Sequence, residues 1–317
     1  MKSRALLLLI AMLGIAGCRA ASAADPVPEE LDRLSTLLAK IEADHPPAAL
    51  KDTFAPNRAA IERVRKTTSP QLRLYRLRDA YVGVATAAFV AAQKDAAANG
   101  EKFLALWNAQ PVRPVATPPG MPLLHASLVQ SSSNRAEKLY RASLPYGKAD
   151  GPFSGAYYLG EAHANAAFAQ LVASLGARAD EQPPGANVLR NALAAMETEM
   201  LGAFGKDPAA PAMISVSVRL KEAQELLDRG SLAGATLLML EARLMYGRAT
   251  APEVKGIVAP PAGLPQDSMA ELWRASDNPI AARDVLPYYV SLRKQNAAAP
   301  AVAAQRVKVT LIRWPYT

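Results

Sequence analysis

The sequence predicts an all-α protein, and three features of its composition and pattern lead to that prediction. Alanine fills long runs such as residues 85–98, and alanine is the strongest helix former. Apolar residues recur at spacings of three and four, which is the period of an amphipathic helix. The 25 prolines and 18 glycines collect between these runs and separate one helix from the next. We therefore expect an Ala-rich, repeat-like array of antiparallel helical hairpins.

The first helical region is expected over residues 27–109. Ser69 and Pro70 form an N-cap with a first-turn proline, so they begin a long helix. Asn99 and Gly100 form the C-terminal signal that should end it. The helices expected in this region are 27–44, 57–66, 70–98 and 101–108.

A proline-rich stretch follows, with five prolines within residues 110–122. Proline fixes φ and lacks the N–H that helices and strands need, so we expect a linker here between two helical regions. The second region, residues 123–317, should end in a short β-strand, because apolar and polar residues alternate over 305–313. Such a strand could pair with a partner's sheet or pack on its own domain.

Capping signals place the helices of the second region. Asn134 with Glu137, and Ser268 with Glu271, each resemble a capping box. Pro287 should kink the last helix. The helices expected are 134–144, 154–175, 184–204, 213–228, 232–246, a short helix from 268 and a last one from 278.

Residues 213–247 predict a helical hairpin that turns at Gly230. Gly230, Ala235 and Ala242 stand where the second helix of a tetratricopeptide repeat has its glycine and alanines, so the hairpin weakly resembles that family. Arg219 and Glu222 depart from the family pattern, which has large apolar residues at those positions. No second copy follows at a spacing of about 34 residues. An ordinary helical pair is the alternative interpretation.

The N-terminus carries an export signal. Lys2 and Arg4 precede an apolar run over residues 5–16, which is shorter than the roughly 20 residues that a membrane-spanning helix needs. The sequence Ile15-Ala16-Gly17-Cys18 then resembles the lipobox of bacterial lipoproteins. That resemblance implies cleavage after residue 17, lipid attachment at Cys18 and a tether over residues 18–26.

Ordinary secretion is the competing interpretation, because Ala21-Ser22-Ala23 fits the general signal-peptidase pattern. Cys18 favours lipidation, since a lone thiol has no disulfide partner in an oxidising compartment. In the lipoprotein family an Asp after the cysteine favours retention in the inner membrane, and here that residue is Arg19. The resemblance therefore implies an outer-membrane lipoprotein facing the periplasm, and a freely secreted periplasmic protein is the alternative.

The remaining sequence offers little catalytic chemistry. The single cysteine and the three scattered histidines have no metal-ligand spacing, so we expect no metal. The sequence contains no phosphate-binding glycine loop and no nucleophile elbow, so we expect no cofactor and assign no catalytic residue. The absence of these motifs disfavours an enzyme.

One helix carries a polar stripe that could bind a ligand. Helical spacing puts Tyr157, Glu161 and Asn165 on one face, with Tyr158 beside Glu161. Such a group could form a pocket for a small molecule or glycan, in which Glu161 could act as a general acid or base. The alternative is a solvated face or a buried glutamate satisfied by the tyrosine hydroxyls.

A second candidate is the basic segment 58–78, which holds seven arginines and lysines and one acid. Arg73 and Arg76 share a helical face there and could bind an anionic lipid or another acidic envelope partner. A solvated face is again the alternative. Nucleic acid is not expected, because the chain is exported and Tyr75 is the one aromatic residue in the segment.

These observations predict a lipid-anchored envelope protein that acts as a helical protein-interaction or scaffold module. The expected partners are the membrane, through Cys18, and a protein or anionic component of the envelope. The alternative is a small-molecule or glycan binder, or an enzyme, with its pocket around Tyr157, Glu161 and Asn165.

Overall fold

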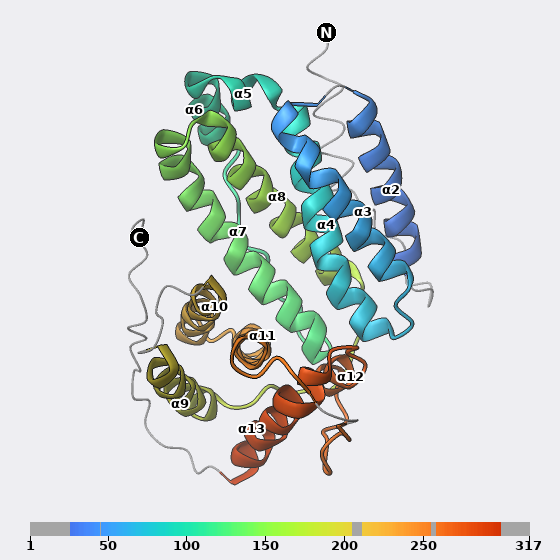
Figure 1. Ribbon diagram of the computed structural model, residues 1–317, viewed down its shortest axis with the longest axis vertical. Coiled ribbons are helices and arrows are strands. Elements are labelled where there is room, and N and C mark those ends of the chain that lie inside the picture. The colour runs from blue at the N-terminus through green and yellow to red at the C-terminus, as the bar shows by residue number, and fades with distance from the viewer. Residues whose placement is uncertain (1–25, 45, 205–210, 255–257, 299–317) are drawn as a thin grey trace. The chain divides into compact units, whose positions relative to one another are not determined.

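The computed structural model describes residues 26–44, 46–204, 211–254 and 258–298. Every regular element in these residues is helical (Figure 1), so the all-α prediction is confirmed for them. The predicted C-terminal strand and Cys18 lie outside the described residues. The elements are α2 (Val27–Ala43), η1 (Ala48–Leu50), α3 (Lys51–Arg65), α4 (Pro70–Ala92), α5 (Lys94–Ala98), α6 (Gly100–Ala109), α7 (Leu123–Ala149), α8 (Pro152–Ser174), α9 (Ala186–Phe204), α10 (Pro211–Asp228), α11 (Leu232–Thr250), α12 (Ser268–Arg274), η2 (Ala281–Val285) and α13 (Leu286–Ala298).

The chain divides into two compact units that are interleaved in sequence. Among the described residues, unit 1 contains those within 26–116 and 132–176, and unit 2 contains those within 117–131 and 177–298. The first crossing therefore falls within the proline-rich stretch 110–122. The second falls inside α7, so one continuous helix contributes to both units.

Unit 1 is organised around α4, which packs against α2, α3 and α8 (Figure 1). Ser69 caps α4 as expected, since its side chain accepts a hydrogen bond from the backbone N–H of Leu72. Tyr81 of α4 and Phe168 of α8 lie deep in the core, with ring centroids 5.7 Å apart. The predicted apolar face of α2 is buried, and its members are Leu31, Leu34, Leu38 and Ile41.

Two predicted helix boundaries in unit 1 are wrong. The helix predicted over 70–98 breaks at Gln93, so α4 ends at Ala92 and the short α5 follows. Asn99 ends α5 as expected, and its side chain also caps α6 by accepting from the backbone N–H of Lys102 at 3.0 Å. Asn134 does not begin a helix, since it is buried in the middle of α7. Ser127, Ser131 and Ser143 of α7 each donate to the carbonyl three residues earlier, so these hydroxyls are satisfied within the helix.

Unit 2 contains the α10/α11 hairpin, which turns at Gly230 with a positive φ of 73°. Residues 214–218 are helical, within the helix predicted over 213–228. Helix α9 packs against both helices of the hairpin, and methionines and leucines of all three fill the core. Helix α12 is capped by Asp267 rather than by Ser268, because Asp267 Oδ1 accepts from the backbone N–H of Ala270 at 2.8 Å.

The last described helix widens before Pro287. Residues of η2 form a π-helix directly ahead of α13. Proline has no N–H to donate to the carbonyl of Arg283 four residues earlier, so a regular α-helical bond cannot form there. The helix instead widens, and the backbone N–H of Leu286 bonds to the carbonyl of Ala281 five residues earlier.

Candidate functional site

The tyrosine and glutamate stripe predicted on α8 forms a real local group, and its members have different roles. Tyr157 and Tyr158 are half-buried. The carboxylate of Glu161 accepts a hydrogen bond from Arg135 of α7, with Nη2 and Oε1 3.1 Å apart. The buried amide of Asn165 donates to the backbone carbonyl of Glu161 at 2.8 Å. Asn165 therefore stabilises its own helix, whereas the other residues remain near the surface.

Tyr146 and Phe153 extend this group. Together with Tyr157 and Tyr158 they are four half-buried rings, which we call the aromatic strip. The rings of Tyr146 and Tyr158 stack with centroids 4.2 Å apart. Tyr157 meets Tyr158 edge-on at 6.3 Å and Phe153 at 6.4 Å. The strip is thus a continuous row of rings that joins the end of α7 to the beginning of α8.

Burial raises the pKa of Tyr157, and the charge of Glu161 raises it further. Burial also raises the pKa of Tyr158, with added contributions from Tyr146 and then Glu161. Both phenols therefore stay protonated near neutral pH and can donate hydrogen bonds to a ligand. Sequence analysis missed Tyr146, Phe153 and Arg135, since their proximity depends on how α7 and α8 pack.

A close helix crossing supports the aromatic strip. A Cβ atom built on Gly155 would lie 2.8 Å from the Cα of Gly147, and Cβ atoms at both glycines would lie 2.5 Å from the ring of Phe103. Only glycine fits at these two positions, which lets α7 and α8 approach beneath the buried ring of Phe103. The crossing fixes where Tyr146 and Tyr158 meet.

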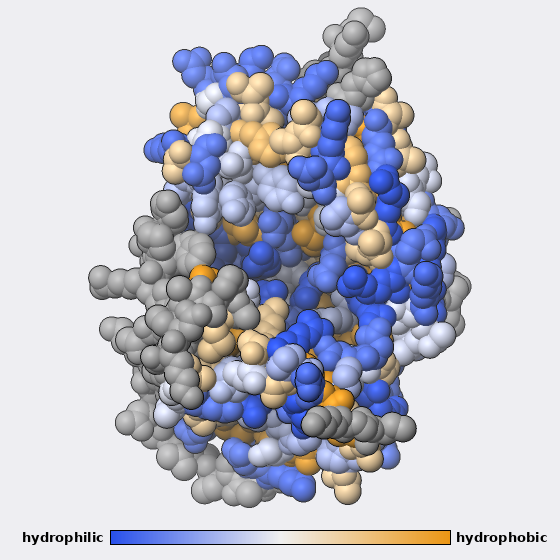
Figure 2. Space-filling view, in the orientation of Figure 1, coloured by the Kyte–Doolittle hydropathy of each residue, from blue (hydrophilic) through white to orange (hydrophobic). Residues whose placement is uncertain are grey.

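Trp107 of α6 and Tyr140 of α7 form a second aromatic contact in unit 1. Their rings are 4.9 Å apart and nearly parallel. The indole N–H donates to the carbonyl of Tyr140, and the tyrosine hydroxyl donates to the carbonyl of Trp107, both at 3.1 Å. Leu104 lies three residues before Trp107, and its side chain is 44% exposed. It is the one strongly exposed large apolar side chain among the described residues. Figure 2 shows a mainly hydrophilic face with scattered apolar residues.

His163 is a packed residue rather than a partner of Glu161. Its imidazole stacks on Phe89 of α4 at 5.2 Å. Burial lowers the pKa of His163, and a hydrogen bond with the backbone of Gln110 opposes that effect in part. Its Nε2 atom is buried and has no hydrogen-bond partner among the described residues.

The basic face predicted around Arg73 and Arg76 has a structural role. The Nε of Arg73 donates to the backbone carbonyl of Thr67 at 2.9 Å, and Nη1 of Arg76 donates to the hydroxyl of Thr67 at 2.9 Å. Thr67 lies in the connection between α3 and α4. Both guanidinium groups therefore hold that connection and are only half exposed.

Unit 2 contains a buried ion triad, which we define as Arg219, Glu222 and Glu241. Arg219 Nη1 lies 2.9 Å from Glu222 Oε2, and its Nε lies 3.0 Å from Glu241 Oε2. The two glutamate side chains are 4% and 3% exposed. Arg219 and Glu222 are the residues that depart from the tetratricopeptide pattern, and the triad explains why they are not apolar.

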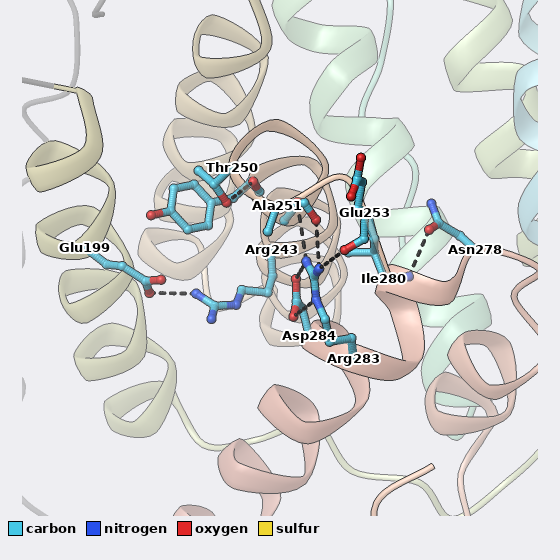
Figure 3. A network of polar contacts seen from close by, with 11 residues as sticks. Glu199, Arg243, Thr250, Ala251, Glu253, Asn278, Ile280, Arg283 and Asp284 are labelled. Carbon is cyan, nitrogen blue, oxygen red and sulfur yellow. Dashed lines mark hydrogen bonds and ion pairs between the residues drawn. The ribbon is translucent and has the colours of Figure 1, made fainter. Parts of the chain in front are cut away.

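Two further arginines of unit 2 join helices (Figure 3). Arg243 of α11 pairs with Glu199 of α9 at 2.6 Å. Arg283 pairs with Asp284 and donates to backbone carbonyls at the end of α11, including that of Ala251 at 2.7 Å. A cation at a helix C-terminus is favourable, so these contacts stabilise the packing of η2 on α11.

A third polar group in unit 2 contains Glu181, Ser268 and His125. Glu181 accepts from the hydroxyl and the backbone N–H of Ser268 at 2.5 and 3.1 Å, and from the N–H of Leu123 at 2.6 Å. The imidazole Nδ1 of His125 has no hydrogen-bond partner in the part of the chain described. A Ser–His–acid catalytic relay is therefore not formed, because the serine bonds the carboxylate directly.

Within the described residues, no group of three or more histidine, cysteine or acidic side chains is placed to hold a metal ion. None of the described helices combines the length and apolar character needed to cross a membrane.

The chain matches no protein-family model, and no curated protein or solved structure is significantly similar to it.

Proposed function

We propose that the protein is a lipid-anchored component of a bacterial envelope, tethered through Cys18, whose helical body acts as a protein-interaction module. The lipobox resemblance supports the anchor. The aromatic strip beside Arg135 and Glu161 supports the interaction surface. In this proposal the outer membrane holds the protein facing the periplasm, and the strip binds an envelope protein.

The observation that carries this proposal is the pairing of Glu161 with Arg135 next to four half-buried rings. The guanidinium of Arg135 engages the carboxylate of Glu161, so the two charged groups lie side by side next to the rings. Aromatic residues and arginine are enriched at the centres of protein interfaces. The group is therefore suited to binding.

The anchor is tested by intact-mass spectrometry of the protein extracted from its native membrane, compared with a Cys18→Ala variant. We expect a chain that starts at Cys18 and carries acyl mass. The variant should lose the acyl mass and leave the membrane fraction. A bare wild-type chain starting near Ala24 would instead support general secretion and reject the anchor.

The interaction surface is tested by placing a photo-crosslinking amino acid at Tyr157 in the anchored protein. We expect one dominant crosslinked envelope protein, and Tyr158→Ala should reduce that product at least about tenfold. Tyr246 of α11 is the control site, since it is also a half-buried tyrosine and lies outside the aromatic strip. Equal crosslinking at Tyr246 and Tyr157 would reject a specific surface.

A glycan ligand is the second candidate, and the geometry of Tyr157 and Tyr158 favours it. Their rings are perpendicular, and the charged groups of Arg135 and Glu161 lie alongside. A sugar ring could stack on one phenol and hydrogen-bond to the charged pair. Sedimentation with insoluble envelope glycan, with and without Tyr157→Ala, tests this alternative. Binding that survives the substitution would exclude the strip as the glycan site.

A further inference from the structure

Three helix ends meet at one end of unit 1, where the chain enters from its N-terminus. Helix α2 begins there at Val27, α3 ends at Arg65 and α4 begins at Pro70. Arg65 Nη2 lies 3.0 Å from Asp32 Oδ1 and 2.9 Å from Ser35 Oγ, so the end of α3 lies against the beginning of α2. We call this part, residues 26–33 and 62–78, the tether end.

Formal charge is unequally distributed along this bundle. The tether end contains seven arginines and lysines and four acids, which gives a net charge of +3. Residues 34–61, which form the rest of α2 and α3, contain three of each and are neutral apart from His45. The basic character of the bundle therefore lies at the end where the chain enters.

Arg63 and Lys66 are the cations of the tether end that face solvent without an ion-pair partner among the described residues. Arg65 is also exposed, but it pairs with Asp32 and Glu62. Arg73 and Arg76 hold the connection between α3 and α4. Arg63 and Lys66 are thus best placed to meet an external anion.

We propose that the tether end is an electrostatic docking face for an anionic bilayer surface, with Arg63 and Lys66 contacting the headgroups. This inference rests on the proposed anchoring at Cys18. Seven residues lie between Cys18 and Pro26, so the eight Cα-to-Cα steps that join them can span at most about 28 Å. The anchor therefore keeps the face near the membrane, where a basic surface supplies the second signal that lipid anchors commonly use.

The test uses the mature chain from residue 18 with Cys18→Ser, so that binding does not depend on an acyl group. Its partitioning is measured on vesicles of phosphatidylcholine with 25% phosphatidylglycerol, and on pure phosphatidylcholine. The docking variant is Arg63→Glu with Lys66→Glu. The matched control is Lys40→Glu with Lys51→Glu, which makes the same charge change at two exposed lysines outside the tether end.

We expect the unsubstituted chain to prefer the anionic vesicles. Each cation near such a surface strengthens binding about fivefold, so the docking variant should bind at least about 25-fold more weakly. The control should change much less. Equal losses in the two variants would show that net charge alone drives binding and would overturn the proposal, as would an absence of binding to anionic vesicles.

Two further measurements keep the result interpretable. Circular dichroism verifies folding, and Arg63→Gln with Lys66→Gln provides a milder variant that should lose most of the same binding. Acylation of Cys18 is measured separately by intact mass. Selective loss in the docking variant with an unacylated native Cys18 would reject the anchor but support the docking face.

Discussion

The α7/α8 crossing of unit 1 and the α10/α11 hairpin of unit 2 are both antiparallel helix pairs, yet they are stabilised differently. The first depends on two residues that have no side chain, because Gly147 and Gly155 let two backbones approach under Phe103. The second depends on charges, because Arg219 compensates two buried glutamates. Different kinds of substitution should therefore destabilise the two pairs.

The difference follows from the physics of the two contacts. Close packing gains dispersion energy and tolerates no added volume. A buried ion triad has a large desolvation cost, and its stability depends on keeping the charges matched. Adding one methyl group should disrupt the crossing, whereas removing one charge should disrupt the hairpin.

The largest effect is expected for Arg219→Met. This substitution removes a cation that pairs with two buried carboxylates, and we expect the free energy of unfolding to fall by about 3–5 kcal/mol. Chemical denaturation followed by circular dichroism measures the loss. Because the hairpin belongs to unit 2, the loss should be greatest for probes placed in that unit.

The control replaces the whole triad with Arg219→Met, Glu222→Leu and Glu241→Met. Replacing a complete buried ion group with apolar residues is often neutral or stabilising. We therefore expect most of the stability to return. If the triple variant were as unstable as Arg219→Met alone, the triad geometry would not explain the loss.

The sequence predicted the fold class correctly because helix formation depends mainly on local pattern. The buried face of α2 follows the spacing of its leucines, and Gly230 does turn the predicted hairpin. The error at Asn134 arises because a residue type that often caps a helix lies inside one here. The same side chain can cap, turn or be buried, and its neighbours in space decide which role it takes.

The second effect concerns the glycine crossing. Gly155→Ala places a methyl group against both Phe103 and the backbone of Gly147, so we expect a loss of about 1–3 kcal/mol. Gly147→Ala collides with the Phe103 ring alone among its nearest atoms. Phe103→Leu should therefore rescue Gly147→Ala more than Gly155→Ala. A double-mutant cycle measured by denaturation tests this difference.

The control for this experiment is Gly202→Ala in α9. Apart from its chain neighbours and the backbone of its own helix, no atom of the described residues lies within 4 Å of a Cβ built at Gly202. Alanine is favoured over glycine in a helix interior, so stability should rise by about 0.5–1 kcal/mol. Equal losses at Gly155 and Gly202 would contradict a role for close approach.

The candidate site was predicted only in part, and its residues show why. Helical spacing placed Tyr157, Tyr158 and Glu161 together correctly. It did not reveal that Asn165 bonds its own helix, or that Tyr146 stacks on Tyr158 from another helix. For Arg73 and Arg76, the charge pattern was visible, but their engagement by Thr67 depends on the fold of one connection.

The smallest effect concerns how stability depends on pH. The glycine crossing contains no titratable group, whereas His163, on the same helix α8, can titrate. Burial lowers the pKa of His163 below its usual value of 6.5. As pH falls below about 6.5, the unfolded chain binds a proton that the folded chain does not, so stability falls. Above that pH the histidine is neutral in both states and the effect disappears.

We expect this histidine to contribute a loss of up to about 1.4 kcal/mol for each pH unit within that window. His163→Phe keeps a ring against Phe89 and should reduce the difference in unfolding free energy between pH 7 and pH 5. Burial also lowers the pKa of His125 in unit 2, so a His125→Phe variant should remove a separate share of the slope. An unchanged slope in His163→Phe would show that α8 does not carry the acid sensitivity, because a neutral ring cannot titrate. Gly155→Ala should leave the slope intact while lowering stability at every pH, since it changes packing without changing a titratable group.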